Sequence, residues 1–157
     1  MPRMAILLAA LLLAPLAGLA AGPSPDERHE TLQDEDFAAG VAAWERQDWT
    51  AMIAPLTRVI RREPWHDDAH SLLGFAHRKL GDYGQSLAHY HRALALNPHH
   101  RQALEYLGEA YVEMGRLDEA RELLGRLAVA CQRVLGAHWR GDCEAWADLR
   151  EALETAP

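Results

Sequence analysis

The stretch DDAHSLLGFAHRKLGDYGQSLAHYHRALALNPHH, residues 67–100, decides the fold of this chain. Apolar and small residues recur in it at helical spacing, Gly81-Asp82 interrupts them once, and Asn97-Pro98 closes the stretch. Gly is typical of tight turns, and Pro cannot continue a helix. The stretch is therefore expected to fold as helix, turn, helix.

The same order of residues recurs every 34 positions along the chain. Gly40, Gly74 and Gly108 keep this spacing, and so do Pro64 and Pro98. Each Gly would let the two helices of a pair approach closely, and each Pro would end the second helix before the next unit begins. The spacing predicts helix pairs at 33–46 with 50–63, 67–80 with 84–96, and 101–114 with 118–134.

This repeat resembles the tetratricopeptide repeat (TPR), a 34-residue unit with the pattern Trp-x-x-Leu-Gly-x-x-Tyr, Ala-x-x-x-Phe and a closing Pro. The middle unit matches at Leu73-Gly74 and, with Tyr for Phe, at Tyr90, whereas His70 and His77 stand where large aromatics are usual. The first unit is the most degenerate, as expected of a terminal unit with one face toward water. The resemblance implies an all-α fold, a right-handed TPR solenoid of three stacked helix pairs.

After the third unit, the stripe of Trp146, Leu149 and Leu153 predicts one more helix over 142–156, with Asp142 as its N-cap. It resembles the capping helix that closes a helical-repeat stack. The chain is thereby divided into 1–20 (signal peptide), 21–32 (flexible linker), 33–66 (TPR 1, degenerate), 67–100 (TPR 2), 101–134 (TPR 3) and 135–157 (loop and capping helix).

The N-terminus has the pattern of a secretory signal peptide. Arg3 precedes an apolar run from Met4 to Leu16 that is short for a membrane span, and small residues follow at Gly18 and Ala20. We expect cleavage after Ala20, a periplasmic or secreted protein, and membrane contact only through the cleaved segment. An uncleaved anchor and a buried N-terminal helix are the alternatives.

The two cysteines lie twelve residues apart, at Cys131 and Cys143, on either side of a Gly-containing reversal. In an exported protein such a pair predicts a disulfide bond. Two buried free thiols or a redox pair are the alternatives.

Composition and motifs exclude several classes of function. The net charge is −7 and no basic block is present, which argues against nucleic acid, because phosphate neutralisation supplies most of that affinity. A Gly-rich phosphate loop, a Gly-x-Ser-x-Gly elbow and a His-Glu-x-x-His pair are all missing. We expect no enzyme activity, no cofactor and no small-molecule substrate.

Nine histidines raise the question of metal binding. His70 and His77 occupy positions that the TPR pattern gives to packed aromatics, so the interpretation is that they replace core residues. No metal site is expected. A His-rich metal-handling or metallocentre-assembly factor remains an alternative function.

The TPR resemblance implies that the first helix of each pair lines a concave groove that holds a peptide or a protein partner. The groove would grade from aromatic through basic to acidic, and Phe75 with Arg78 would mark its centre. The Lys and Asn pattern with which some chaperone-binding TPRs clamp a terminal carboxylate is not reproduced. The groove residues expected from the resemblance are Phe37, Val41, Trp44, Ser71, Phe75, Arg78, Lys79, Gln102, Glu105, Glu109 and Val112.

The expected function is that of an exported adaptor or scaffold with a role in envelope complex assembly, similar to small secreted bacterial TPR proteins. Two alternatives stay open: Phe37, Val41 and Trp44 could pack beneath the N-terminal spacer or in a homodimer contact, and the chain could be a structural subunit of a larger envelope complex.

Overall fold

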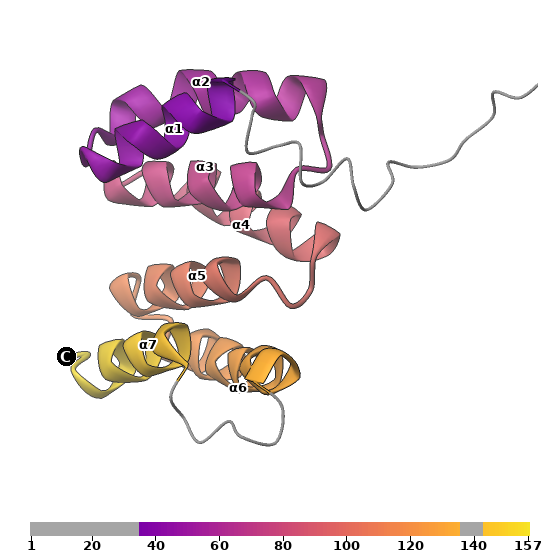
Figure 1. Cartoon of the computed structure of the whole chain (residues 1–157). Coiled ribbons are helices and arrows are strands. Elements are labelled where there is room, and N and C mark those ends of the chain that lie inside the picture. The colour runs from indigo at the N-terminus through magenta and orange to yellow at the C-terminus, as the bar shows by residue number, and fades with distance from the viewer. Residues whose placement is uncertain (1–34, 136–142) are drawn as a thin grey trace, which may run out of the picture.

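The computed structural model describes residues 35–135 and 143–157, and all regular secondary structure in these two ranges is α-helical. The helices stack in the order of the chain, with α1, α3, α5 and α7 following one another down one side (Figure 1). The predicted all-α class is confirmed. The predicted signal peptide and linker lie outside the described residues, among which no helix is long and apolar enough to cross a membrane. The helices are α1 (Glu35–Glu45), α2 (Trp49–Arg62), α3 (Asp67–Lys79), α4 (Tyr83–Leu96), α5 (Arg101–Glu113), α6 (Leu117–Leu135) and α7 (Glu144–Glu154).

The second helices of the first two units begin at aspartate caps. Asp48 and Asp82 each accept a hydrogen bond from a backbone N–H three residues on, at 3.1 Å. These bonds satisfy donors that the first turn of a helix leaves without a partner. Gly81 precedes one cap at φ +79°, a left-handed turn position that Gly adopts without a steric cost.

The first helices of the second and third units are capped by histidines instead. His66 and His100 lie 34 residues apart, and the Nδ1 atom of each accepts a hydrogen bond from the backbone N–H three residues on, at 3.3 and 3.4 Å. Both rings are buried. Because Nδ1 is the acceptor, each neutral ring carries its hydrogen on Nε2.

The repeated glycines lie at close helix contacts. A Cβ atom added to Gly74 would meet the ring of Tyr90 at 2.6 Å, and one added to Gly40 would meet Leu56 at 2.6 Å. These contacts join the two helices of a pair, as predicted. Gly108 differs, because its added Cβ would meet Leu149 of α7 at 2.5 Å instead of α6. The prediction of a contact within the third pair was therefore wrong, and the last helix occupies that place.

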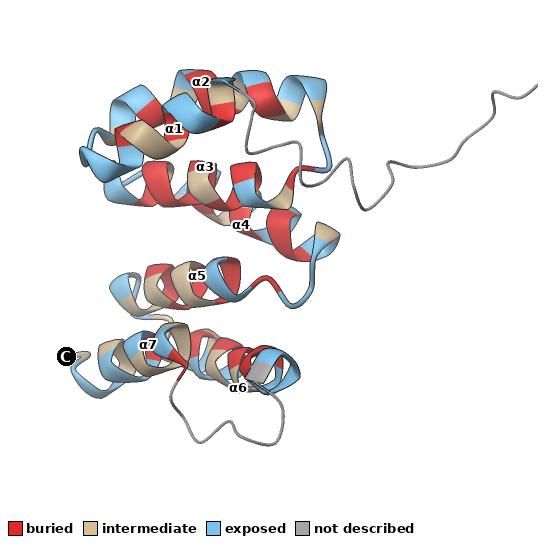
Figure 2. Cartoon of the chain, in the orientation of Figure 1, coloured by how far each residue is buried: buried red, intermediate tan, exposed pale blue. Residues whose placement is uncertain are grey.

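Two buried clusters make up the core, and buried residues are coloured red along the helices in Figure 2. One joins α1, α2 and α3, and the other joins α4 to α7. Tyr106 of α5 packs against both clusters, and with the contact of Tyr90 on Gly74 it links the two halves of the stack.

The C-terminal helix packs on α5 and α6, as a capping helix would. It begins at Glu144 with Cys143 at the N-cap position, two residues later than predicted, and the proposed cap Asp142 lies outside the described residues. The sulfur atoms of Cys131 and Cys143 lie 2.11 Å apart, and their Cα atoms 6.0 Å apart. Both residues are buried. The geometry allows the predicted disulfide.

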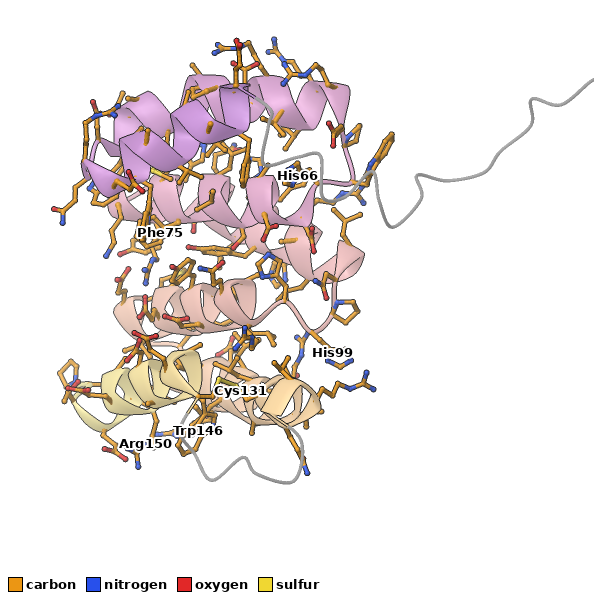
Figure 3. The ribbon with its side chains drawn as sticks, viewed as in Figure 1. His66, Phe75, His99, Cys131, Trp146 and Arg150 are labelled. Carbon is orange, nitrogen blue, oxygen red and sulfur yellow. A yellow bond between two sulfur atoms is a disulfide. The ribbon has the colours of Figure 1, made fainter. Side chains whose placement is uncertain are left out.

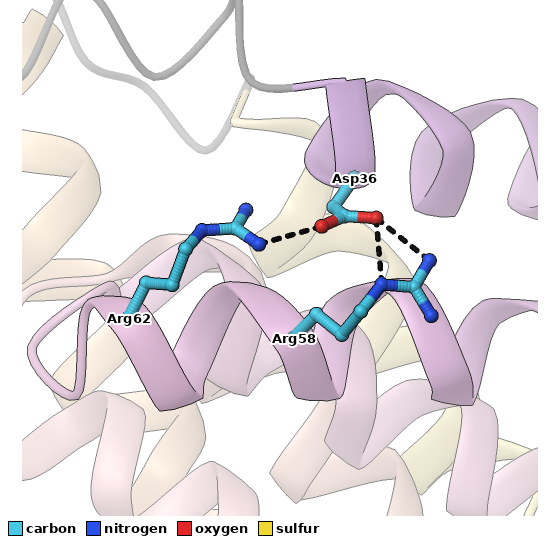
Figure 4. A network of polar contacts seen from close by, with 3 residues as sticks. All are labelled: Asp36, Arg58 and Arg62. Atoms are coloured by element: carbon cyan, nitrogen blue, oxygen red, sulfur yellow. Dashed lines mark hydrogen bonds and ion pairs between the residues drawn. The ribbon is translucent and has the colours of Figure 1, made fainter.

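In the first unit an ionic contact takes the place of aromatic packing (Figure 4). Asp36 stands where the repeat pattern has Trp, and its carboxylate accepts hydrogen bonds from Arg58 at 2.7 and 2.9 Å and from Arg62 at 2.6 Å. These bonds, those from Arg58 first, lower the pKa of Asp36 below its usual value. The arginines thus fasten α1 to α2 at the degenerate end of the stack.

Candidate partner-binding groove

A groove of about 780 Å³ runs across the first helices of the successive units. Loop residues between α4 and α5 close one side of it. Four helices supply its other walls, so it exists only in the assembled stack. The wall residues used below are Trp44 of α1, Asp67 and Asp68 of α3, Arg101, Gln102, Glu105 and Tyr106 of α5, and Glu144 and Asp148 of α7.

Four aromatic side chains, Trp44, Trp49, Phe75 and Tyr106, form an aromatic cluster beside the groove. The ring of Phe75 lies 4.8 Å from that of Tyr106, 5.4 Å from Trp49 and 6.5 Å from Trp44, measured between centroids. Figure 3 shows Phe75 on the α3 side that faces α5. Phe75 is only 8% exposed, whereas Trp44 is 38% exposed. Trp44 and Tyr106 can therefore contact a partner, and Phe75 supports them from below.

Arg78 is buried under this aromatic cluster. Its guanidinium lies 5.3 Å from the Phe75 ring centroid and 5.7 Å from that of Tyr106. One guanidinium nitrogen also forms ion pairs with Glu109 at 2.5 Å and Glu113 at 3.4 Å. The groove therefore lacks the basic centre that was expected at Arg78, because Glu109 and Glu113 of α5 balance its charge.

Two carboxylates of the groove wall have partners on neighbouring segments. Asp67 accepts a hydrogen bond from the Asn97 side chain at 2.8 Å. Asp68 lies 3.0 Å from Nε2 of His100, and the hydrogen bond from this ring lowers the pKa of Asp68. Both contacts connect the first turn of α3 to the segment between α4 and α5 and occupy a hydrogen-bonding site on each carboxylate.

Three other carboxylates of the wall, Glu105, Glu144 and Asp148, make no hydrogen bond or ion pair within the described part of the chain. Burial raises the pKa of Glu105 to about 7, and repulsion from Glu109 and Asp148 adds to this rise. The charge of Arg78 opposes this rise in the pKa without cancelling it, as expected of a buried carboxyl group near like charges that forms no ion pair of its own.

The structure brings together only part of the expected groove. Trp44, Gln102 and Glu105 line it. Four further expected residues are buried, namely Phe37, Ser71, Phe75 and Arg78. Val41, Glu109 and Val112 are partly exposed and Lys79 is exposed, and none of these four is part of the groove wall.

An acidic part of the groove with Glu105 was expected, but Tyr106 and the α7 carboxylates were not foreseen. Tyr106 follows Glu105 directly and has no counterpart in the TPR pattern, so only its aromatic character could have suggested it. Glu144 and Asp148 belong to α7, which was assigned a capping role alone. Their position in the groove depends on how α7 docks.

Three histidines stack between α3 and α4. Nδ1 of His70 lies 3.2 Å from Nδ1 of His89, and the rings of His89 and His77 stack with centroids 5.7 Å apart. Nε2 of His70 lies 3.3 Å from the carbonyl oxygen of Pro64, which can only accept, so His70 donates there and accepts from His89. His70 is buried and packs between helices, in keeping with the interpretation of a replaced core residue.

This stack makes stability depend on pH. Burial, followed by the nearby His70 and His77, lowers the pKa of His89 from 6.5 to about 4. Between pH 6.5 and 4 the unfolded chain therefore binds a proton that the folded chain does not, and stability falls as pH falls. We expect this histidine to remove on the order of 2–3 kcal/mol of unfolding free energy between pH 7 and 4.

The measurement is urea unfolding at pH 7, 5.5 and 4 for wild type and His89→Phe. The variant removes the titrating group, so the difference between the two proteins isolates it from other groups, such as Glu105, whose shift has the opposite sign. The prediction would be contradicted if the free energy of unfolding of the two proteins changed with pH by the same amount.

One set of possible metal ligands occurs among the described residues: His66, Asp67 and Asp68, whose donor atoms lie within 4.8 Å of one another. These residues form the N-cap and first turn of α3. The helix dipole disfavours a cation there, and Asp67 and Asp68 already have partners. We assign no metal to them.

Comparison with known proteins agrees with this architecture. The family described as "Tetratricopeptide repeat" matches residues 77–130, from the end of α3 into α6. Among solved structures, the TPR2B domain of yeast Sti1, in a complex with pHsp70, matches with a TM-score of 0.68 at 18% sequence identity, covering 76% of this chain and 94% of that chain. No curated protein sequence matches the chain. The fold is that of a TPR solenoid.

Proposed function

We propose that this chain is a non-enzymatic adaptor that binds a segment of another protein in its groove. The observation that carries the proposal is the groove itself, whose walls four helices supply in the folded chain. Trp44 is exposed in it, and Tyr106 lines it beside carboxylates that form no ion pair within the described residues. Preformed sites bind with a small ordering cost, and aromatic side chains commonly dominate binding energy. The structural likeness to the Sti1 domain, which was solved in complex with pHsp70, supports a protein partner.

We further propose that the adaptor works outside the cytoplasm of a bacterium, after cleavage behind Ala20. The N-terminal pattern supports export, and the cysteine pair supports an oxidising compartment, where disulfides persist. A role in assembling envelope complexes would fit such a location. Mass spectrometry of the protein purified from an envelope fraction tests this: the mature N-terminus should be Ala21.

A groove-filling substitution tests the adaptor function. Gln102 is exposed on the groove wall, and Gln102→Trp should occupy the space that a partner would use. A random-peptide phage library is selected on the wild type, and the peptides enriched are titrated against both proteins. We expect the variant to weaken their binding at least about tenfold, which is about 1.4 kcal/mol.

Glu122→Trp is the matched control, because Glu122 is exposed on α6 and lies outside the groove. It should leave peptide binding within about twofold of the wild type, and both variants should keep the wild-type circular dichroism and melting temperature. Peptides that bind both variants equally well would place the binding elsewhere and overturn the proposal.

A further inference from the structure

The groove wall has an imbalance of charge that its own side chains do not correct. Five of the lining residues are carboxylates, and the one lining arginine is Arg101. Asp67 and Asp68 are engaged by Asn97 and His100. The other three carboxylates form no ion pair within the described residues. The charge of Arg78 opposes the rise in the pKa of Glu105. Its guanidinium, however, is ion-paired with Glu109 and Glu113.

The three unpaired carboxylates come from two helices that meet at a close contact. Leu149 of α7 packs against Gly108 of α5, and this contact brings Asp148 near Glu105. The folded protein therefore contains repulsion between Asp148 and Glu105. A cation between α5 and α7 would relieve it.

Two aromatic residues of the same groove suit a cationic side chain. Trp44 is 38% exposed, and the ring of Tyr106 already lies 5.7 Å from the guanidinium of Arg78. Arginine stacks well on such rings and forms paired hydrogen bonds with carboxylates. A groove that combines free carboxylates with aromatic rings therefore selects arginine-containing segments over neutral ones.

Resting on the adaptor function proposed above, we infer that the groove receives a basic segment of another protein, with an arginine side chain between Glu105 and the α7 carboxylates and an apolar side chain against Trp44. A second copy of this chain is a poor occupant, because the chain carries a net charge of −7. Its own residues 21–34 are also acidic, with four carboxylates and one arginine.

The raised pKa of Glu105 gives the binding a pH signature. A bound cation favours the ionised carboxylate, so binding near neutral pH should release a proton and strengthen as pH rises from 6 to 8. Binding to carboxylates with ordinary pKa values would not change over this range.

The test uses a fluorescein-labelled nonapeptide that alternates arginine and leucine around one central tryptophan. The same peptide with citrulline in place of arginine keeps the shape and removes the charge, and a third version carries glutamate. Fluorescence anisotropy at pH 7.5 in 150 mM salt should show the arginine peptide binding at least about tenfold more tightly than the citrulline peptide. The full-length mature protein is used throughout.

Two variants locate the interaction. The double variant Glu105→Gln with Asp148→Asn should weaken the arginine peptide at least about tenfold and abolish the pH dependence, while Glu122→Gln, which removes an equally charged group outside the groove, should change it less than about twofold. Because the double variant removes repulsion, its thermal stability should not fall. Equal weakening by the double variant and by Glu122→Gln would reduce the effect to net charge and overturn the inference.

The two proposals fail in different ways. If neutral or acidic library peptides bind in the groove, lose affinity with Gln102→Trp and outcompete the arginine peptide, the adaptor function stands and the basic partner is wrong. If the arginine peptide binds both Gln102→Trp and the wild type equally, it binds elsewhere and the inference fails. A dimer that forms through the groove, detected by analytical ultracentrifugation and lost with Gln102→Trp, would overturn both proposals.

Discussion

Replacing Tyr90 with alanine is expected to lower the free energy of unfolding by about 3–5 kcal/mol. The Tyr90 side chain is fully buried, and its ring fills the space above Gly74 at the contact between α3 and α4. Alanine would leave a cavity there that the two helices cannot close without shifting. Urea unfolding followed by circular dichroism at 222 nm measures the loss.

Tyr90→Phe is the matched control, because it keeps the ring against Gly74. Its free energy of unfolding should fall by less than about a third of the decrease in Tyr90→Ala, since the ring supplies most of the buried surface. If alanine cost less than about 1 kcal/mol, the close packing of the middle unit would not be its main source of stability.

Breaking the link between Cys131 and Cys143 should lower stability by about 3 kcal/mol on the chain-entropy model. The proposed disulfide would tether α7 to α6, and α7 places Leu149 in the core against Gly108. Cys143→Ser should therefore unfold at a lower urea concentration than the oxidised wild type. The measurement is urea unfolding with and without 5 mM dithiothreitol.

The reductant provides the control. It should lower the urea concentration at which the wild type unfolds to about that of Cys143→Ser, and it should not change the urea concentration at which the variant unfolds. Thiol titration of the oxidised, denatured wild type should find no reactive thiol. Two reactive thiols, or a wild type that does not respond to reductant, would show that the cysteines are unlinked.

The same tether connects stability to the groove. Glu144 and Asp148 reach the groove only while α7 is docked on α5. Undocking of α7 would remove two of its unpaired carboxylates. A chain without the disulfide should accordingly bind basic peptides more weakly even where it stays folded.

Much of the fold could be predicted from sequence because its signals are local. The 34-residue spacing of Gly40, Gly74 and Gly108 fixed the helix pairs, and the observed helix ends lie within a few residues of those predicted. Aspartate and histidine caps, turn glycines and closing prolines act through neighbours only a few positions away. Most of these signals occur in two of the three units, and they can be recognised without knowledge of the packing.

The candidate site could be predicted only in part, because its chemistry depends on distant partners. Trp44, Gln102 and Glu105 were expected at the groove and line it, but Phe75 is buried under aromatic neighbours and Arg78 is balanced by α5. The sequence shows that these side chains share a helix face. It does not show which opposite charge will reach them.

The sequence by itself thus determined a stack of helix pairs, because a helix and its turn depend on residues close along the chain. Only the tertiary structure decided that Leu149 of α7, and not a residue of α6, packs on Gly108, and that Asp148 consequently stands near Glu105. The reason is that burial and charge pairing depend on distance in space. In this chain the docking of the last helix sets those distances and adds Glu144 and Asp148 to the carboxylates of the groove.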